Sequence, residues 1–151
     1  MGNDGGKMFT GSYFHFMDNK GRVSIPSRYR EILQERKDRQ LTLTNFRGYI
    51  MAFPQSEWAQ IEAKFAAQPL FRKEVRDFQR FLISGAEDCP LDRQGRILVP
   101  PNLRDYAKLN REVCLVGAIR CFEIWDRQTY ESHRKQLEES ITDEVLHELL
   151  I

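Results

Sequence analysis

The chain has few of the residues and motifs that usually mark an enzyme. Its 151 residues include three cysteines and three histidines. No Cys-x-x-Cys pair occurs, and no two histidines lie four positions apart on one helical face, so neither common kind of zinc site is expected. A glycine-rich phosphate loop, a nucleophile elbow and a cysteine–histidine pairing are also missing. We therefore expect no metal, no cofactor and no catalysis, and an enzyme is the least favoured interpretation.

Long hydrophobic runs and targeting signals are missing as well. No stretch approaches the roughly 18 apolar residues that a membrane span needs, and the sequence contains no recognisable signal peptide. These absences predict a cytoplasmic protein without a membrane partner. Cys114 and Cys121 lie in apolar, strand-like runs and are expected to be buried. The glycine-rich stretch 1–7 is either a natural extension or a cloning remnant, so that the native start is Met1 or Met8.

Neither sign of charge is in excess overall, because 23 lysines and arginines nearly balance 22 acidic residues. The distribution is uneven, however. Residues 18–47 contain eight basic and four acidic residues, whereas residues 131–151 contain two basic and six acidic ones. The basic region predicts a polyanionic partner. The acidic end faces solvent or a neighbouring subunit.

The most informative feature that is present is an internal repeat. The segment 18–26 (DNKGRVSIP) returns 74 positions later as 92–100 (DRQGRILVP). Both copies consist of Asp-x-x-Gly-Arg followed by four residues that end in proline. The similarity continues downstream, where residues 41–51 resemble 113–124. Farther on, an apolar helical spacing is shared by Trp58, Ile61 and Phe65 in the first copy and Tyr130, His133 and Leu137 in the second.

The chemistry of each copy predicts its local structure. An aspartate accepts hydrogen bonds from the backbone ahead of it, and glycine supplies a positive φ, so each motif should form a tight hairpin tip. A short strand follows and ends at a proline that can start a helix, which predicts helices over 27–33 and 102–109. Each unit is thus a hairpin, a short helix, a second hairpin and an amphipathic helix. Both units are too small to fold alone and should share one core.

Two further amphipathic helices are expected outside the repeated segments. One lies within 69–84 and carries Arg72, Lys73, Arg76 and Arg80 away from its apolar stripe. A solvated helix face explains these cations better than contact with nucleic acid. The other contains Ile141, Val145 and Leu149 and packs on its own core or on another subunit. The sequence leaves that choice open.

The twin tips allow a structural and a functional interpretation. In the first, Asp18 pairs with Arg22, and Asp92 with Arg96, only to fix each turn. In the second, two tips related by a pseudo-two-fold axis present their basic residues from one surface. Arginine binds phosphate oxygens or the O6 and N7 atoms of guanine, and a two-stranded ribbon fits the major groove. The duplication favours the second interpretation.

These segments resemble the MraZ family of bacterial regulators, in the SpoVT-AbrB-like superfamily, whose signature is a duplicated Asp-x-x-x-Arg motif. Here the motif stands at 18–22 and 92–96, and the flanks DCPLD (88–92), VCLVG (113–117) and FEIW (122–125) are similar too. The resemblance covers about residues 8–140. It implies an α+β fold in which duplicated ββα half-barrels form one pseudo-two-fold, swapped-hairpin β-barrel with peripheral helices.

The resemblance also divides the chain and implies a function. The expected units are an extension (1–7), a first repeat (8–68), a connecting helix (69–88), a second repeat (89–137) and a C-terminal helix (138–151). Family members bind short G-rich direct repeats of double-stranded DNA at the promoter of the division and cell-wall gene cluster, which they repress. They form rings of about eight to twelve subunits. Association with the nucleoid would follow.

We therefore predict a sequence-specific DNA-binding regulator. The expected DNA contacts are Arg22 and Arg96, helped by Lys20, Arg93 and Arg28. The expected braces of the tips are Asp18, Gly21, Asp92 and Gly95. Two rivals remain: an antitoxin-like module that captures a toxin with its tail, and a purely structural ring. The duplication disfavours the first, because such modules build their barrel from two chains, and a DNA-binding assay separates the second.

Overall fold

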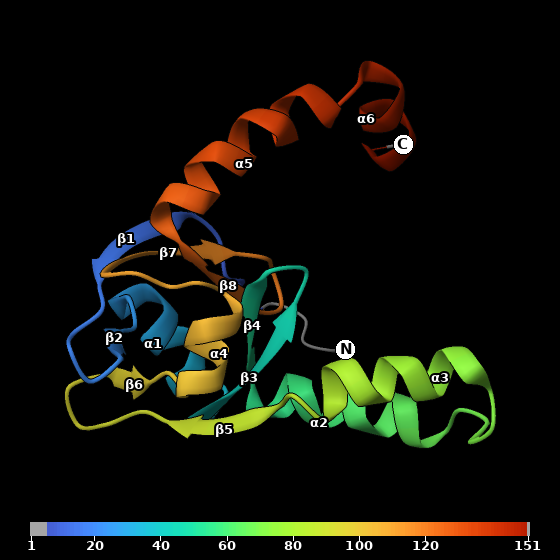
Figure 1. Cartoon of the computed structure of the whole chain (residues 1–151), viewed down its shortest axis with the longest axis horizontal. Helices are drawn as coiled ribbons and strands as arrows, with labels where there is room; N and C mark the ends of the chain where they lie inside the picture. Colours follow the sequence, from blue (N-terminus) through green and yellow to red (C-terminus); the bar gives the residue numbers. More distant parts are fainter. Residues whose placement is uncertain (1–5, 151) are drawn as a thin grey trace.

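The computed structural model describes residues 6–150 and shows an α+β fold (Figure 1). The first repeat supplies β1 (Ser12–Phe16), β2 (Arg22–Ser24), α1 (Ser27–Glu35), β3 (Gln40–Phe46), β4 (Tyr49–Pro54) and α2 (Gln55–Ala66). It is followed by α3 (Lys73–Phe78) and a π-helix, η1 (Gln79–Ile83). The second repeat supplies β5 (Glu87–Pro90), β6 (Arg96–Leu98), α4 (Pro101–Tyr106), β7 (Glu112–Gly117), β8 (Phe122–Asp126) and α5 (Arg127–Ser140), before α6 (Asp143–Leu150). Of the predicted extension 1–7, residues 1–5 lie outside the described residues.

Six strands form one antiparallel sheet in the order β1-β7-β8-β4-β3-β5. Equivalent strands of the two repeats occupy equivalent places from either end of this order, as a pseudo-two-fold relation requires. The first strand of each repeat leaves its own half: β1 pairs with β7, and β5 pairs with β3. Because each half completes the sheet of the other, neither repeat has a complete sheet of its own.

The two remaining strands, β2 and β6, form a separate two-stranded ribbon. Arg22 pairs with Leu98, and Ser24 pairs with Arg96. Beyond the strands, the Ile25 N–H donates to the Gly95 carbonyl at 2.9 Å, and an equivalent 2.9 Å bond joins Val99 to Gly21. Two symmetric bonds therefore fix the tip of each repeat to the strand of the other.

The structure corrects the prediction of two simple hairpins. The turn at residues 18–22 forms, but β1 and β2 on either side of it pair with strands of the other repeat. Pro26 ends β2 after three residues, and the ribbon packs inward through Val23 and Ile97, both buried. Within residues 6–150 the strands do not close into one hydrogen-bonded barrel, because β1 and β5 remain the edges of an open sheet.

The main core lies between the sheet, the ribbon and the short helices α1 and α4. Tyr29 of α1 is fully buried and packs against Phe9 and Phe122, with ring centroids 5.1 and 5.0 Å away. The hydroxyl of Tyr29 donates to the carbonyls of Thr10 and Gly11. The other large buried side chains come from both repeats: Ile25, Ile32, Leu33, Leu41, Leu43, Ile50, Ile97, Leu103 and Leu115. As expected, the two halves share one core.

Two helical arms leave this body (Figure 1). In one, α2 runs outward and α3 returns beside it. Residues 69–84 were predicted as a helix, but α3 begins only at Lys73 and continues as a π-helix from Gln79. In the other arm, α5 rises from the opposite side and α6 follows at its far end. No helix of residues 6–150 combines the length and apolarity that a bilayer crossing requires.

Candidate nucleic-acid interface

Tip 1, residues 18–22, is organised around one carboxylate. Asp18 Oδ1 accepts from the backbone N–H groups of Lys20 (3.0 Å) and Arg22 (2.8 Å). Asp18 Oδ2 accepts from Nε of the Arg22 side chain at 2.6 Å. Gly21 closes the turn with φ +91°, in the left-handed region that favours glycine. The carboxylate thus holds both the turn and the guanidinium that follows it.

Tip 2, residues 92–96, repeats this arrangement bond for bond. Asp92 Oδ1 accepts from the backbone of Gln94 (2.8 Å) and Arg96 (2.9 Å), and Oδ2 accepts from Arg96 Nε at 3.0 Å. Gly95 has φ +75°. The same network is built twice from segments 74 positions apart, as the sequence motif indicated.

The ribbon brings both arginines to one face. Alternate residues of a strand point to opposite faces, and Val23 and Ile97 are the buried ones. Arg22 and Arg96 therefore share the outer face with Ser24 and Leu98. The register makes the arginines diagonal neighbours, a relation that places two residues about 7–8 Å apart, with their Cβ atoms somewhat closer.

A second pair of arginines, which the sequence analysis did not select, lies against the tips. A Cβ added at Gly21 would lie 2.6 Å from Cζ of Arg104, and one at Gly95 would lie 2.5 Å from Cδ of Arg30. Arg30 and Arg104 are equivalent in the duplication, four residues after Pro26 and Pro100. Each packs on the glycine of the other repeat. The signal that could have found them was the shared Pro-x-x-x-Arg spacing.

The helix arginines are held less firmly than the strand arginines. Arg30 Nε donates to the Ile25 carbonyl at 3.1 Å. Nε of Arg104 is buried and has no hydrogen-bond partner within residues 6–150. For Arg22 and Arg96 the ion pair uses Nε and leaves 33% and 27% of the side chain exposed. Their terminal nitrogens form no hydrogen bond with the described part of the chain, and they are able to donate to a ligand.

The remaining predicted residues are placed less symmetrically. Lys20 and Arg93 are exposed in the two turns, but they align with Gln94 and Asn19 rather than with each other. Arg28 is exposed at the start of α1. Of the predicted residues, only the aspartate, glycine and strand arginine of each tip have an equivalent in the other repeat; Lys20, Arg93 and Arg28 do not.

The electrostatics of the tips keep both carboxyl groups ionised. The hydrogen bond from the Arg22 backbone N–H lowers the pKa of the Asp18 carboxyl below its usual 3.8, and the Arg22 side chain adds to the effect. The pKa of Asp92 is lowered in the same way by Arg96. At neutral pH each tip therefore contains a charged acceptor and a charged donor in contact.

Most of the charged residues of the tips and of the helix arginines packed on them are cationic. Around the ribbon the cations are Lys20, Arg22, Arg30, Arg93, Arg96 and Arg104, against the carboxylates of Asp18 and Asp92. Arginine's planar fork binds oxygen pairs of a phosphate or of a guanine edge. No cluster of three or more potential metal ligands occurs among residues 6–150. The chemistry available here is recognition of an anion or a nucleic acid.

Comparisons with known proteins agree with the duplication. A family model described as "MraZ protein, putative antitoxin-like" matches the chain twice, over residues 8–81 and 82–149. The "Transcriptional regulator MraZ" of Desulforamulus reducens is 41% identical over 133 residues, which cover 88% of this chain and 92% of that protein. The proteins of the same name from Thioalkalivibrio sulfidiphilus and Natranaerobius thermophilus are 44% and 37% identical. They cover 85% and 92% of this chain, and the matches span 87% and 97% of those proteins.

Proposed function

The chain belongs to the MraZ family, and from this we propose that it is a transcriptional regulator that binds double-stranded DNA through the β2–β6 ribbon. The relatives are named as transcriptional regulators, which supports a regulator without catalytic activity. The observation that carries the proposal is the pair of braced arginines, Arg22 and Arg96, on one exposed face.

In this proposal Arg22 and Arg96 donate to base edges or phosphates of the major groove, which admits a two-stranded ribbon. Asp18 and Asp92 do not touch the anionic duplex. They fix the orientation of each guanidinium through Nε and leave the terminal nitrogens for DNA. Lys20, Arg93 and Arg28 add contacts to phosphates, and Arg30 and Arg104 join them from α1 and α4.

The finer parts of the proposal follow the family. The target is a set of short G-rich direct repeats at the promoter of the division and cell-wall gene cluster, and the effect is repression in the cytoplasm, at the nucleoid. One bidentate base contact contributes only about 1–3 kcal/mol. A ring of about eight to twelve subunits that binds several repeats at once would convert weak contacts into avid binding.

The intertwined half-barrel is also part of the proposal. The exchange of β1 and β5 between the repeats and the symmetric strand order support it. Of the expected units 8–68, 69–88, 89–137 and 138–151, we move two boundaries. The second repeat begins with β5 at Glu87, and α5 belongs to it up to Ser140, which leaves α6 (Asp143–Leu150) as the C-terminal helix. In this arrangement one chain supplies both tips, so that a single subunit is the smallest DNA-binding unit.

The proposal is tested by fluorescence anisotropy with the duplex that precedes this gene, with and without its repeats. We expect Arg22→Ala and Arg96→Ala each to weaken specific binding by at least tenfold, with an unchanged circular dichroism spectrum. Arg134→Ala removes the same charge from the exposed surface of α5 and serves as the matched control. If Arg22→Ala binds the repeats as tightly as the wild type, the assignment of the site fails. If the wild type binds no DNA, the protein is better explained as a scaffold.

Salt dependence tests the phosphate contacts separately. For each neutralised phosphate, binding should weaken by about 0.9 log units per log unit of salt. The wild type and Arg134→Ala should share one slope, whereas Lys20→Ala should have a smaller one. A flat titration would contradict contact with the DNA backbone.

A further inference from the structure

The two tips carry the same kinds of side chain in opposite order. Each tip is a β-turn in which the glycine N–H donates to the aspartate carbonyl at 3.0 Å, so two central residues lie between them. In tip 1 these residues are an amide followed by a cation, Asn19 and Lys20. In tip 2 they are a cation followed by an amide, Arg93 and Gln94. The duplicated network is therefore symmetric, but the side chains that it presents are not.

The central side chains do not serve the turns themselves. All four are exposed, and none of them forms a hydrogen bond or an ion pair with the described part of the chain. The turns use only the backbone N–H groups of Lys20 and Gln94, which donate to the aspartates at 3.0 and 2.8 Å. The reversed order of amide and cation thus has no structural role in the turns, and these side chains are available to a ligand.

The tips differ in the placement of charge but not in its amount. Tip 1 with Arg104, which packs on it, contains three basic residues and one acidic residue, and tip 2 with Arg30 contains the same numbers. Contacts to phosphates carry no sequence information, so attraction to the DNA backbone does not distinguish the tips. Base edges do, because arginine and lysine match the O6 and N7 acceptors of guanine, whereas asparagine and glutamine match adenine. Reversing amide and cation therefore changes the base sequence that fits a tip.

The surroundings of the tips differ as well. Arg30 donates from Nε to a backbone carbonyl at 3.1 Å, whereas the buried Nε of Arg104 has no partner within residues 6–150. Just before tip 1, Phe16 is 68% exposed and lines a hollow of about 240 Å³. The equivalent residue before tip 2 is Pro90. Both halves of the surface are thus chemically distinct around a common two-fold frame.

We propose that the two tips read different halves of each DNA repeat, and that the central residues of the turns fix the direction in which the protein lies on the duplex. A two-fold symmetric reader matches a palindromic site, and it binds any site equally in both directions. Subunits of a ring all point the same way around it, as direct repeats do along DNA, so a directional reader fits both. The inference rests on the proposed function and makes Asn19, Lys20, Arg93 and Gln94 specificity-determining residues.

Site-directed DNA cleavage by the full chain reads this direction. Iron–EDTA is attached to one introduced cysteine, either Asp105→Cys on α4, which packs on tip 1, or Glu31→Cys on α1, which packs on tip 2. Both positions are exposed and are equivalent in the duplication, and the native cysteines are buried. With ascorbate and hydrogen peroxide, the chelate cuts nearby DNA of a short duplex that carries one repeat. The label at 105 should cut one flank of the repeat and the label at 31 the other, each with a preference of roughly tenfold.

Exchange of the turn residues separates direction from binding strength. Asn19→Arg with Lys20→Gln gives tip 1 the central residues of tip 2, and Arg93→Asn with Gln94→Lys does the converse. Neither pair changes the net charge. Each double variant should cut both flanks to a similar extent, because its tips have become alike. The quadruple variant should cut with the flanks reversed, a result that loss of structure cannot produce.

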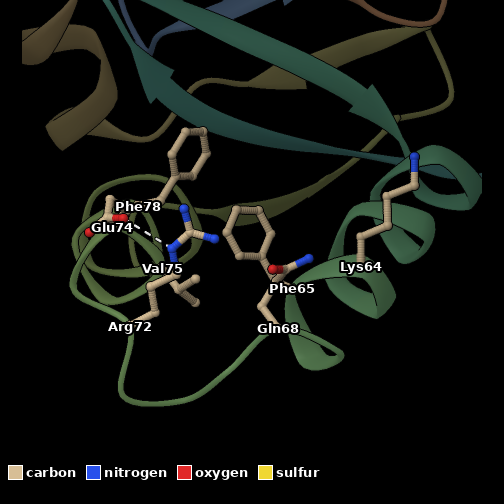
Figure 2. A pocket seen from close by; sticks show the side chains of 7 residues that line it. All are labelled: Lys64, Phe65, Gln68, Arg72, Glu74, Val75 and Phe78. Carbon is tan, nitrogen blue, oxygen red and sulfur yellow. Dashed lines mark hydrogen bonds and ion pairs between the residues drawn. The ribbon is translucent and has the colours of Figure 1, made fainter.

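The matched control exchanges a cation and an amide far from the ribbon. Lys64 and Gln68 lie on the α2–α3 arm (Figure 2), which leaves the body away from β2 and β6 (Figure 1). Lys64→Gln with Gln68→Lys should keep the wild-type cutting pattern.

Two results would overturn the inference while leaving DNA binding intact: equal cutting of both flanks by the wild type, or a quadruple variant that keeps the wild-type flanks. A wild type that shows neither repeat-dependent cutting nor binding in the anisotropy assay would contradict the proposed function, and the inference with it. Failure of the direction and failure of DNA binding are therefore distinguishable.

Discussion

Substituting the tip glycines separates the stability of the turns from their role in binding. Gly21, Gly95 and Gly48 all have positive φ, at +91°, +75° and +90°. Alanine disfavours this region by about 1–2 kcal/mol. All three Gly→Ala variants should therefore lower the free energy of unfolding by about that amount.

The surroundings of the three glycines differ. A Cβ at Gly48 would meet nothing within 4 Å, whereas at Gly21 it would lie 2.6 Å from the guanidinium carbon of Arg104. Ordinary carbon contacts lie at about 3.5–4.0 Å, so Arg104 must withdraw by about 1 Å. At Gly95 the displaced side chain is Arg30. Both are flexible side chains, so their displacement adds little to the loss of stability but rearranges the cationic surface.

Equal stability loss with unequal binding loss is the expected result. Urea unfolding should give similar free-energy changes for Gly21→Ala, Gly95→Ala and Gly48→Ala. Anisotropy with the promoter duplex should show several-fold weaker binding for the two tip variants and unchanged binding for Gly48→Ala. If Gly21→Ala and Gly95→Ala bind as well as Gly48→Ala, the arginines packed on the glycines have no part in DNA binding.

Three further predictions concern a brace, a core contact and the thiols. Asp18→Asn removes a negative charge from the tip, yet it should weaken DNA binding in the anisotropy assay because Arg22 loses its charged acceptor; tighter binding would contradict the bracing role. Tyr29→Phe removes the hydrogen bonds to the Thr10 and Gly11 carbonyls, at 3.1 and 3.0 Å. Urea unfolding should show that the free energy of unfolding falls by about 0.5–1.5 kcal/mol. An unchanged free energy would mean that these bonds do not stabilise the fold. Burial raises the pKa of the Cys89 and Cys121 thiols to about 12 and that of Cys114 to about 11. A thiol reagent at pH 8 should thus leave the native protein unmodified, and the free energy of unfolding should fall as the pH rises above 9.0, the ordinary value at which unfolded thiols ionise; fast labelling of the native protein would contradict this burial.

Local features of the fold were predictable because they depend on local chemistry. The turns at Asp18 and Asp92 follow from a carboxylate and a glycine at fixed spacing. Pro26 and Pro100 end one element and begin the next, and α1 and α4 start close to the predicted positions. The α+β class followed from the resemblance to the MraZ family.

The partners of the strands were not predictable from those local signals. A repeat of Asp-x-x-Gly-Arg is compatible with two independent hairpins and with exchanged strands, because the turn has the same hydrogen bonds in both. Only the core distinguishes them, since Val23 and Ile97 are buried together when β2 pairs with β6. The open edges at β1 and β5 likewise depend on long-range pairing rather than on composition.

The sequence predicted the residues at the two tips of the candidate site but not the helix arginines that pack against them. The duplicated motif identified Asp18, Arg22 and their equivalents, which the ribbon brings to one face. Arg30 and Arg104 were missed although both follow a proline by four residues, because that shared spacing marks them as equivalent but does not show that each contacts the glycine of the other repeat.

The most direct test of the central claim is a double-mutant cycle across the interface between protein and DNA. Guanines of the promoter repeats are replaced one at a time by 7-deazaguanine, which lacks the N7 acceptor, and the affinities of the wild type, Arg22→Ala and Arg96→Ala are compared by anisotropy. Each arginine should show a coupling of about 1–3 kcal/mol with one particular guanine. If the losses from the altered guanines and the altered arginines are additive at every position, the ribbon arginines do not contact these bases.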